Sequence, residues 1–359
     1  MLVRMKAGII LCLLAIAGAS ALSAQPADSE AMCKQYLQTP LPAEATNIAA
    51  PKTWPDCESY KSYSGIGRTV DYVAARKCAW AERLATQKEL EPQYTIDSVV
   101  GGSGMLAVLY ANGEGVERNT SLAKRFACEA RIPGAFSDID KAGGGDKVKF
   151  CDEVRTTMEI GFCAAWGEEL SDQERHAAFD AMISNWTAEQ KRAFTALAKT
   201  DESYAEAHAG GELDTSGSGR AIWELDEEAD FKQRFTLAIQ KFESGDLPAG
   251  TAKDAATADA QLNAVYQKAV KLADAGKFGY GAVQPDGIRK TEQAWIRYRD
   301  VWLRFAKLRY PATPASAWLT LITKDRTDVL KATLCEIDAD ARGSECTDEG
   351  EPKPSRPLP

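Results

Sequence analysis

The sequence predicts an all-α protein in which a short helical-repeat region precedes a small antiparallel helical domain. Three observations support this fold class. Apolar residues recur at helical spacing, as they do from Ile288 to Phe305; capping and helix-ending residues bound such segments; and no segment alternates polar and apolar residues as a strand does. With 359 residues, the chain is long enough for two domains.

The first residues have the pattern of a cleavable export signal. Arg4 and Lys6 precede an apolar run from Ala7 to Ala17, and small residues suited to cleavage follow it. The run is short for a membrane span. We therefore expect residues 1–24 to be removed, and the mature protein to be periplasmic or secreted with no membrane span.

The chain is acidic, with 43 Lys and Arg residues against 52 Asp and Glu residues and a net charge of −9. Loss of the signal would remove two basic residues and leave a net charge of −11. This balance disfavours a nucleic-acid partner, because contacts with phosphates require clustered Lys and Arg. It is typical of a soluble protein, and it would also steer the chain towards a basic partner.

Eight cysteines follow the expected signal, and an even number in an exported chain favours disulfides. Two pairs are the most plausible on spacing. Cys335 and Cys346 would close a short loop after the last helix, and Cys151 and Cys163 lie on either side of a short helical segment. The other pairings stay open. Since no Cys or His cluster has metal-ligand spacing, we expect neither a metal nor another cofactor.

Two segments of the first half, residues 64–82 and 112–130, resemble each other at a shift of 48 residues, which aligns Gly65 with Gly113. In both, glycines predict a tight turn before a helix. The pattern resembles the Sel-one-like repeats, short relatives of tetratricopeptide repeats that bind peptides or proteins. We expect two degenerate copies within residues 25–206, which could form a peptide groove or serve only as a packing module.

Residues 207–220 are polar and glycine-rich, and the sequence predicts a linker there. Before this stretch, Ser171 and Thr187 each begin a capping-box pattern that predicts the start of a helix. After it, we expect residues 221–346 to form the second helical domain. Residues 347–359 have the composition of a disordered tail.

Three segments of the second domain resemble the LprI-type lysozyme-inhibitor family: "ADAQLNAVY", "IRKTEQAWIRYRD" and "LTLITKDRTDVL". The resemblance implies an exported, helical, disulfide-bonded domain with a protein partner, such as lysozyme or a cell-envelope protein. The family carries one Cys shortly after "YRD" and another before "LT". Here Leu303 (or Trp302) and Trp318 stand in those places, which implies that packing of apolar and aromatic side chains replaces a disulfide.

The resemblance and the helical spacing together single out a cluster of candidate binding or structural residues. They are Asp259, Asn263, Glu292, Trp295, Tyr298, Arg299 and Asp300. Glu292 and Arg299 lie on the edge of the apolar stripe, where a charge cannot be both buried and unpaired. We expect Arg299 to be a structural charge satisfied by Asp259 or Glu292 rather than a partner contact. Trp295 would anchor an interface if exposed, but its spacing favours the core.

The sequence favours a binding protein over an enzyme. Its two histidines, His176 and His208, have ordinary structural explanations as a surface pair and as a residue near a helix end. No nucleophile elbow or phosphate loop is present in the sequence. We expect an exported, non-enzymatic protein that inhibits lysozyme-type muramidases or another basic cell-envelope partner. The alternative is a periplasmic scaffold with no inhibitory activity.

Overall fold

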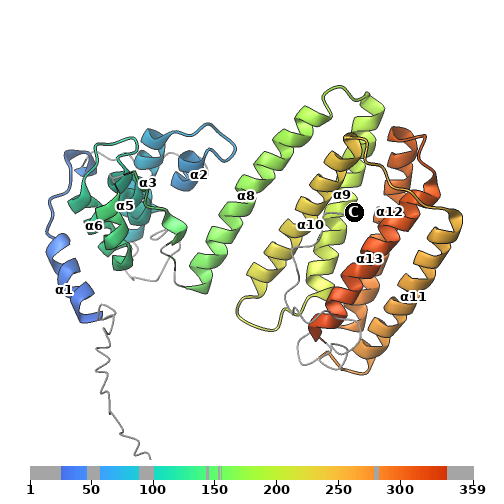
Figure 1. Ribbon diagram of the computed structural model, residues 1–359. Coiled ribbons are helices and arrows are strands. Elements are labelled where there is room, and N and C mark those ends of the chain that lie inside the picture. Colours follow the sequence, from blue (N-terminus) through green and yellow to red (C-terminus); the bar gives the residue numbers. More distant parts are fainter. Residues whose placement is uncertain are drawn as a thin grey trace, which may run out of the picture.

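The fold is all-α, as predicted (Figure 1). The computed structural model describes residues 26–46, 57–88, 101–142, 145–152, 154, 156–278 and 283–337. Every regular element in these ranges is a helix, and the one β-type pairing found there is an isolated bridge between Ala142 and Asp146. The expected signal, the expected tail and Cys346 lie outside the described residues.

The N-terminal part is a compact group of helices with its own apolar core. Its helices are α1 (Pro26–Tyr36), α2 (Ser59–Ser64), α3 (Tyr72–Lys88), α5 (Gly102–Asn112), α6 (Thr120–Glu129) and α7 (Phe136–Lys141), with 3-10 turns at Ala43–Thr46, Pro133–Ala135 and Phe150–Asp152. Helix α5 is buried along its length because α3 and α6 both pack against it. Disulfide Cys33–Cys128 ties α1 to α6, and Cys57–Cys78 ties the residues just before α2 to α3.

The two similar segments adopt the same turn. Gly65 and Gly67 have φ angles of +80° and +67°, and Gly113 and Gly115 have φ angles of +69° and +63°. Only glycine adopts this left-handed region readily. A Cβ on Gly115 would also lie 2.7 Å from the backbone carbonyl carbon of Tyr72. The helix–turn–helix geometry is therefore repeated, while the resemblance to Sel-one-like repeats stays a prediction.

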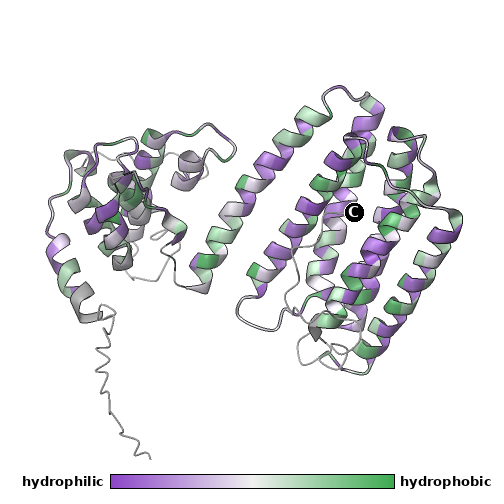
Figure 2. Cartoon of the chain, viewed as in Figure 1, coloured by the Kyte–Doolittle hydropathy of each residue, from purple (hydrophilic) through white to green (hydrophobic). Residues whose placement is uncertain are grey.

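The C-terminal part is a bundle of six long helices. They are α8 (Thr157–Met182), α9 (Ala188–Glu212), α10 (Arg220–Glu243), α11 (Ala252–Asp274), α12 (Pro285–Arg309) and α13 (Ala315–Ile337). Helix α12 packs along α9, α11 packs along α13, and α10 lies between α8 and α9. Their apolar faces turn inward and their polar faces outward (Figure 2). The predicted apolar stripe of α12 is core, with Ile288 and Phe305 fully buried.

Helix α8 contributes to both apolar cores. Near its start, Phe162 and Trp166 pack against the N-terminal core, and near its end Phe179 and Met182 pack against the C-terminal one. The helix is uninterrupted between these two contacts. The two cores are thus joined by one continuous helix, α8, rather than by a linker.

The start of α8 is fixed by local chemistry. Thr156 and Glu159 form a capping box, and the disulfide Cys151–Cys163, with a Cα–Cα distance of 5.7 Å, confirms one predicted pair. The helix start predicted at Ser171 is wrong, since the Ser171 hydroxyl donates to a carbonyl inside α8. The other predicted start is confirmed at α9, where Thr187 and Gln190 form a capping box.

The linker predicted at residues 207–220 is wrong over its first part, because α9 continues to Glu212. Gly211 there serves close packing rather than flexibility. A Cβ on Gly287 of α12 would lie 2.9 Å from the Cα atom of Gly211, so both helices need glycine where they cross. Buried residues of α9, such as Phe194, belong to the same core as α12. The C-terminal bundle therefore begins within α8 and not at residue 221.

Candidate functional site in the C-terminal bundle

The two aromatic residues of the predicted cluster lie in the core of the bundle. Trp295 and Tyr298 are both buried in the face of α12 that meets the neighbouring helices. The ring of Tyr298 stacks on Tyr204 of α9, with centroids 5.6 Å apart. Trp295 is therefore not exposed as an interface anchor.

The two polar residues predicted on α11 lie on its exposed face and bind each other. The Asn263 side-chain amide donates to the Asp259 carboxylate at 3.1 Å and to the Asp259 carbonyl at 2.9 Å. Both residues are exposed. They do not contact the charges of α12, so this half of the cluster is a separate surface feature.

The two partners predicted for Arg299 are wrong. Its guanidinium pairs with its neighbour Asp300 at 2.8 Å, and its side chain is 27 % exposed. It also lies over the ring of Trp295, with its carbon 5.3 Å from the centroid. Neither Asp259 nor Glu292 is its partner, because Glu292 is already bound by an arginine from α13.

That arginine is Arg326, whose side chain is 0 % exposed. Its Nε donates to Glu292 at 3.1 Å, and its two terminal nitrogens donate to the Glu212 carboxylate at 2.7 and 2.6 Å. Such a two-pronged contact is the strong geometry for an arginine and a carboxylate. Arg326 therefore links α13 to α9 and to α12.

The polar network continues from Glu212 to α10 through His208. The His208 ring lies 2.8 Å from Glu212 through Nδ1 and 3.1 Å from Glu227 through Nε2. Burial opposes the charged form of His208, but both glutamates stabilise it and raise its pKa. Burial likewise opposes ionisation of Glu212, but Arg326 and His208 lower its pKa. A chain of buried ionic contacts thus runs through α10, α9, α13 and α12.

An aromatic contact is present at one of the two positions singled out by the family resemblance. Trp302, one of the two positions proposed for the lost Cys, contacts Trp318 edge to face with ring centroids 5.8 Å apart. Trp318 also packs against Phe242 and Tyr310. The other proposed position, Leu303, is partly buried at the margin of this core.

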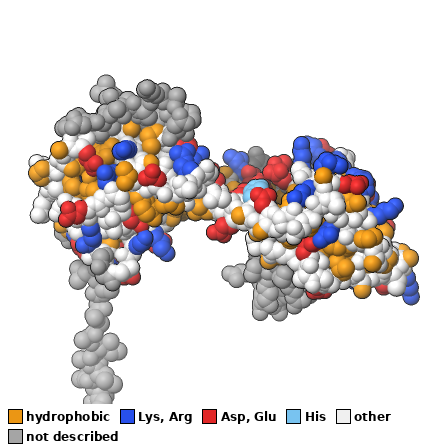
Figure 3. Space-filling model, turned by 90° about the horizontal axis from the view of Figure 1, so that it is seen from above, with side chains coloured by type: hydrophobic (Ala, Val, Ile, Leu, Met, Phe, Trp, Pro, Cys, Tyr) orange, Lys and Arg blue, Asp and Glu red, His pale blue; other side chains and the backbone are white. Residues whose placement is uncertain are grey.

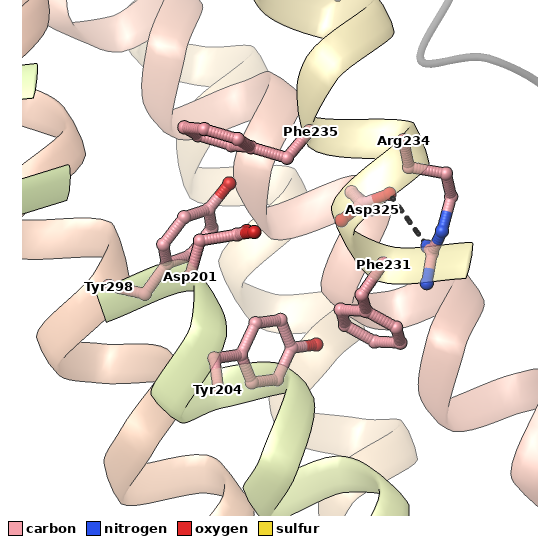
Figure 4. Close-up of a pocket in the computed structure, with 7 residues that line it drawn as sticks. All are labelled: Asp201, Tyr204, Phe231, Arg234, Phe235, Tyr298 and Asp325. Carbon is pink, nitrogen blue, oxygen red and sulfur yellow. Dashed lines mark ion pairs between the residues drawn. The ribbon is translucent and has the colours of Figure 1, made fainter. Parts of the chain in front are cut away.

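A small cavity lies beside the ionic network, where α9, α10, α12 and α13 meet (Figure 4). Its volume is about 20 Å³. Its lining residues are Asp201, Tyr204, Phe231, Arg234, Phe235, Tyr298 and Asp325. Burial raises the pKa of Asp201 well above its usual value, and Arg234 offsets this only in part. Burial also raises the pKa of Asp325.

Charge is divided unequally along the bundle. Residues 157–243, from α8 to α10, hold 8 Lys and Arg residues against 18 Asp and Glu residues, a net charge of −10. Residues 245–330 hold 13 against 9, a net charge of +4. Partial burial raises the pKa of Asp226 on α10, and repulsion from Glu168 of α8 raises it further by a smaller amount. Figure 3 shows Asp and Glu side chains close together on the side of the bundle where α8 lies.

The described residues contain no group of three or more His, Cys, Asp or Glu side chains placed to hold a metal ion. Among the helices of the described ranges, none is long and apolar enough to cross a membrane.

Comparison with known proteins gives one positive result. No curated protein and no solved structure matches the chain. A family profile described as "Lysozyme inhibitor LprI" matches residues 245–330, the segment that contains α11, α12 and most of α13. These C-terminal helices are therefore similar to the lysozyme-inhibitor domain LprI.

Proposed function

We propose that the chain is an extracytoplasmic, non-enzymatic protein that binds and inhibits a lysozyme-type muramidase or another basic protein of the cell envelope. The match of residues 245–330 to a lysozyme-inhibitor family carries this proposal. The disulfides support an oxidising compartment, since such bonds are rare in the cytosol. Export through a signal at residues 1–24 remains part of the proposal.

The distribution of charge supports a basic partner and suggests which surface meets it. The family-matched segment carries a net charge of +4, so the acidic excess lies in α8 to α10, which precede it. A concentrated charge of one sign accelerates encounter with a partner of the opposite sign. We propose that the acidic face of α8 and α10 guides the partner to the bundle.

A muramidase assay on the mature protein tests the proposal. Turnover of a peptidoglycan suspension should fall when the protein is added at low salt, and inhibition should weaken as salt screens the charges. The triple variant Glu224→Gln, Asp226→Asn and Glu228→Gln removes acidic charge from α10 and should weaken inhibition. A matched triple variant on the LprI-like segment, Asp259→Asn, Asp274→Asn and Asp328→Asn, should inhibit as the parent does. Full turnover at every salt concentration would count against inhibition.

The alternative function is that of a periplasmic scaffold, and the repeated helix–turn–helix geometry of the N-terminal part favours it. A scaffold would hold an envelope protein through these helices and leave muramidases active. Affinity capture from an envelope extract separates the two functions. If the triple variant of α10 still captures an envelope protein and the muramidase stays fully active, the scaffold function is favoured.

A further inference from the structure

One tryptophan of the bundle lies at the surface. Trp223, in the first turn of α10, is 43 % exposed. Its indole ring rests against residues 216–219, the glycine-rich loop that leads into α10. A Cβ on Gly219 would lie 2.8 Å from two ring carbons, and a Cβ on Gly217 would lie 3.1 Å from another. Glycine at these two positions therefore lets the loop support the ring while part of the ring stays open to solvent.

Most other tryptophans of the chain have their rings covered. Three of them lie beneath an arginine whose guanidinium carbon is 4.5 to 5.4 Å from the ring centroid: Trp80 beneath Arg83, Trp186 beneath Arg309 and Trp295 beneath Arg299. Trp166, Trp302 and Trp318 pack against other aromatic rings. Among the tryptophans that the structure describes, Trp223 is the one with neither kind of neighbour. Its ring is a free platform of the kind that this chain elsewhere covers with arginine.

The chain around Trp223 is strongly acidic. Residues 214–230 hold six acidic residues against one basic residue, a net charge of −5. Glu227 lies beside His208, and Asp230 pairs with Arg234. The other four acids form no ion pair within the described ranges: Asp214, Glu224, Asp226 and Glu228. This excess of negative charge favours a cation at the ring and disfavours a carboxylate or phosphate.

Arginine suits such a platform better than lysine does. A planar guanidinium can stack flat on an indole, and its N–H groups then remain free to donate to carboxylates at the edge of the ring. Asp214 precedes the glycine loop and Glu224 follows Trp223 directly, so both ends of this stretch carry acceptors. Because the loop already supports the indole, little rotamer freedom is lost when a partner binds.

We infer that Trp223 is the platform for an arginine side chain on the surface of a basic protein partner. This inference rests on the proposed function, which supplies the basic partner, and it adds the side chain through which α10 holds that partner. Tryptophan and arginine are enriched among the few interface residues that contribute most to binding. The acidic charge of the helix guides the encounter, and stacking on Trp223 then slows dissociation.

Calorimetric titration of the mature protein with an end-blocked tetra-arginine peptide at low salt tests the inference. A tetra-lysine peptide has the same charge and should bind more weakly, since it cannot stack flat on the ring. Trp223→Leu keeps an apolar side chain but removes the π face, and it should weaken binding of the arginine peptide about two- to fivefold. Trp223→Phe should lie between this variant and the parent. The matched control is Ile296→Ala on α12, a comparably exposed apolar residue at 38 %, which should bind as the parent does.

The loop offers a second test that leaves the tryptophan in place. Gly219→Ala would push the ring away from the loop, because the added carbon would lie 2.8 Å from it, and should weaken arginine binding as Trp223→Leu does. Gly210→Ala on α9, where the added carbon meets no atom within 4 Å, should leave binding unchanged. Circular dichroism confirms that each variant is folded. Equal affinity for the arginine and lysine peptides, or unchanged arginine binding in both Trp223→Leu and Gly219→Ala, would overturn the inference.

The inference and the proposed function can fail separately. In the muramidase assay, Trp223→Ala should raise the concentration needed for half inhibition about thirtyfold, as expected for an interface residue of this kind. Inhibition that is unchanged in this variant would overturn the inference and leave the function standing. Arginine-peptide binding that depends on Trp223, in a protein that does not inhibit muramidase, would support the platform and count against the proposed function.

Discussion

Arg326 of α13 and Glu212 of α9 form a two-pronged ion pair in which both side chains are 0 % exposed. The two residues are far apart in the sequence, and Glu212 lies outside the segment that matches the lysozyme-inhibitor family. Each charge depends on the other for compensation, because water does not reach either. This pair therefore ties the matched helices to the helices that precede them.

Replacing Arg326 should destabilise the bundle severely. Removing one partner of a buried ion pair costs about 3–5 kcal/mol, because the remaining carboxylates stay buried without compensation. Arg326→Ala should lower the free energy of unfolding by this amount in chemical denaturation. Arg299→Ala is the matched control, since its pair with Asp300 is partly exposed and a surface pair contributes about 0–1 kcal/mol. Similar losses in the two variants would contradict the assignment of Arg326 as the structural arginine.

The stability of the bundle should fall as pH rises above neutrality. The pKa of His208 is raised in the fold because Glu212 and Glu227 outweigh the effect of burial. A group with a raised folded pKa stabilises fully below its unfolded pKa, about 6.5 for His, and this stabilisation is lost as pH rises through the folded value. Thermal melts across this range should therefore show a declining midpoint. His208→Gln should flatten the decline, whereas His176→Gln on the exposed face of α8 should leave the profile as in the parent.

The crossing of α9 and α12 should tolerate no side chain at Gly287. A Cβ there would meet the backbone of Gly211, and overpacking of this kind costs about 1–3 kcal/mol. Gly287→Ala should accordingly lower the denaturation midpoint. Gly210→Ala has no atom within 4 Å of the added carbon and should stabilise α9 by up to about 1 kcal/mol. The two substitutions should change the free energy of unfolding in opposite directions. Equal effects would argue against the close crossing of the two helices.

Trp318 should behave as a core residue. It is buried against Trp302, Phe242 and Tyr310, and emptying a large aromatic site costs about 3–5 kcal/mol. Trp318→Ala should show this loss in urea denaturation. Trp223→Ala on α10 is the control, because Trp223 is exposed and such surface changes cost about 0.5 kcal/mol. A small effect at Trp318 would mean that its aromatic contacts contribute little to the stability of the bundle.

A disulfide between Cys335 and Cys346 should close the end of α13. Mass-spectrometric mapping of the unreduced protein should recover a peptide that joins these two residues. The Cys151–Cys163 peptide serves as the internal standard, since that bond is present in the fold. Recovery of Cys346 as a free thiol, or joined elsewhere, would refute the pairing.

The fold class followed from local patterns, whereas the domain boundary did not. Apolar spacing and capping boxes depend on neighbouring residues, which is why the core face of α12 and the start of α9 could be predicted. Gly210 and Gly211 looked like a linker because glycine is read locally as a sign of flexibility. The actual setting of Gly211 depends on Gly287, far along the chain, and no local pattern shows that contact.

The candidate site was predicted only in part, for the same reason. Glu292 could be recognised as a charge that needs a partner, but helical spacing offered Arg299 on its own helix rather than Arg326 on α13. His208 and Glu212 lie four residues apart, which is the spacing of a side-chain pair on one face of a helix. The sequence predicted a linker over these residues, so this pair was missed. The cavity beside Asp201 brings together side chains from separate helices, so no local pattern points to it.

Helix α8 has a practical consequence for work with fragments of this protein. A recombinant chain cut to residues 245–330 would lack α9, which covers most of the inner face of α12, and would leave Arg326 without Glu212. A cut at the start of the bundle would sever α8 from the disulfide that anchors it. The stretch that resembles a family is thus shorter than the bundle to which it belongs, and truncations for binding studies need to retain at least the chain from Cys151 onward.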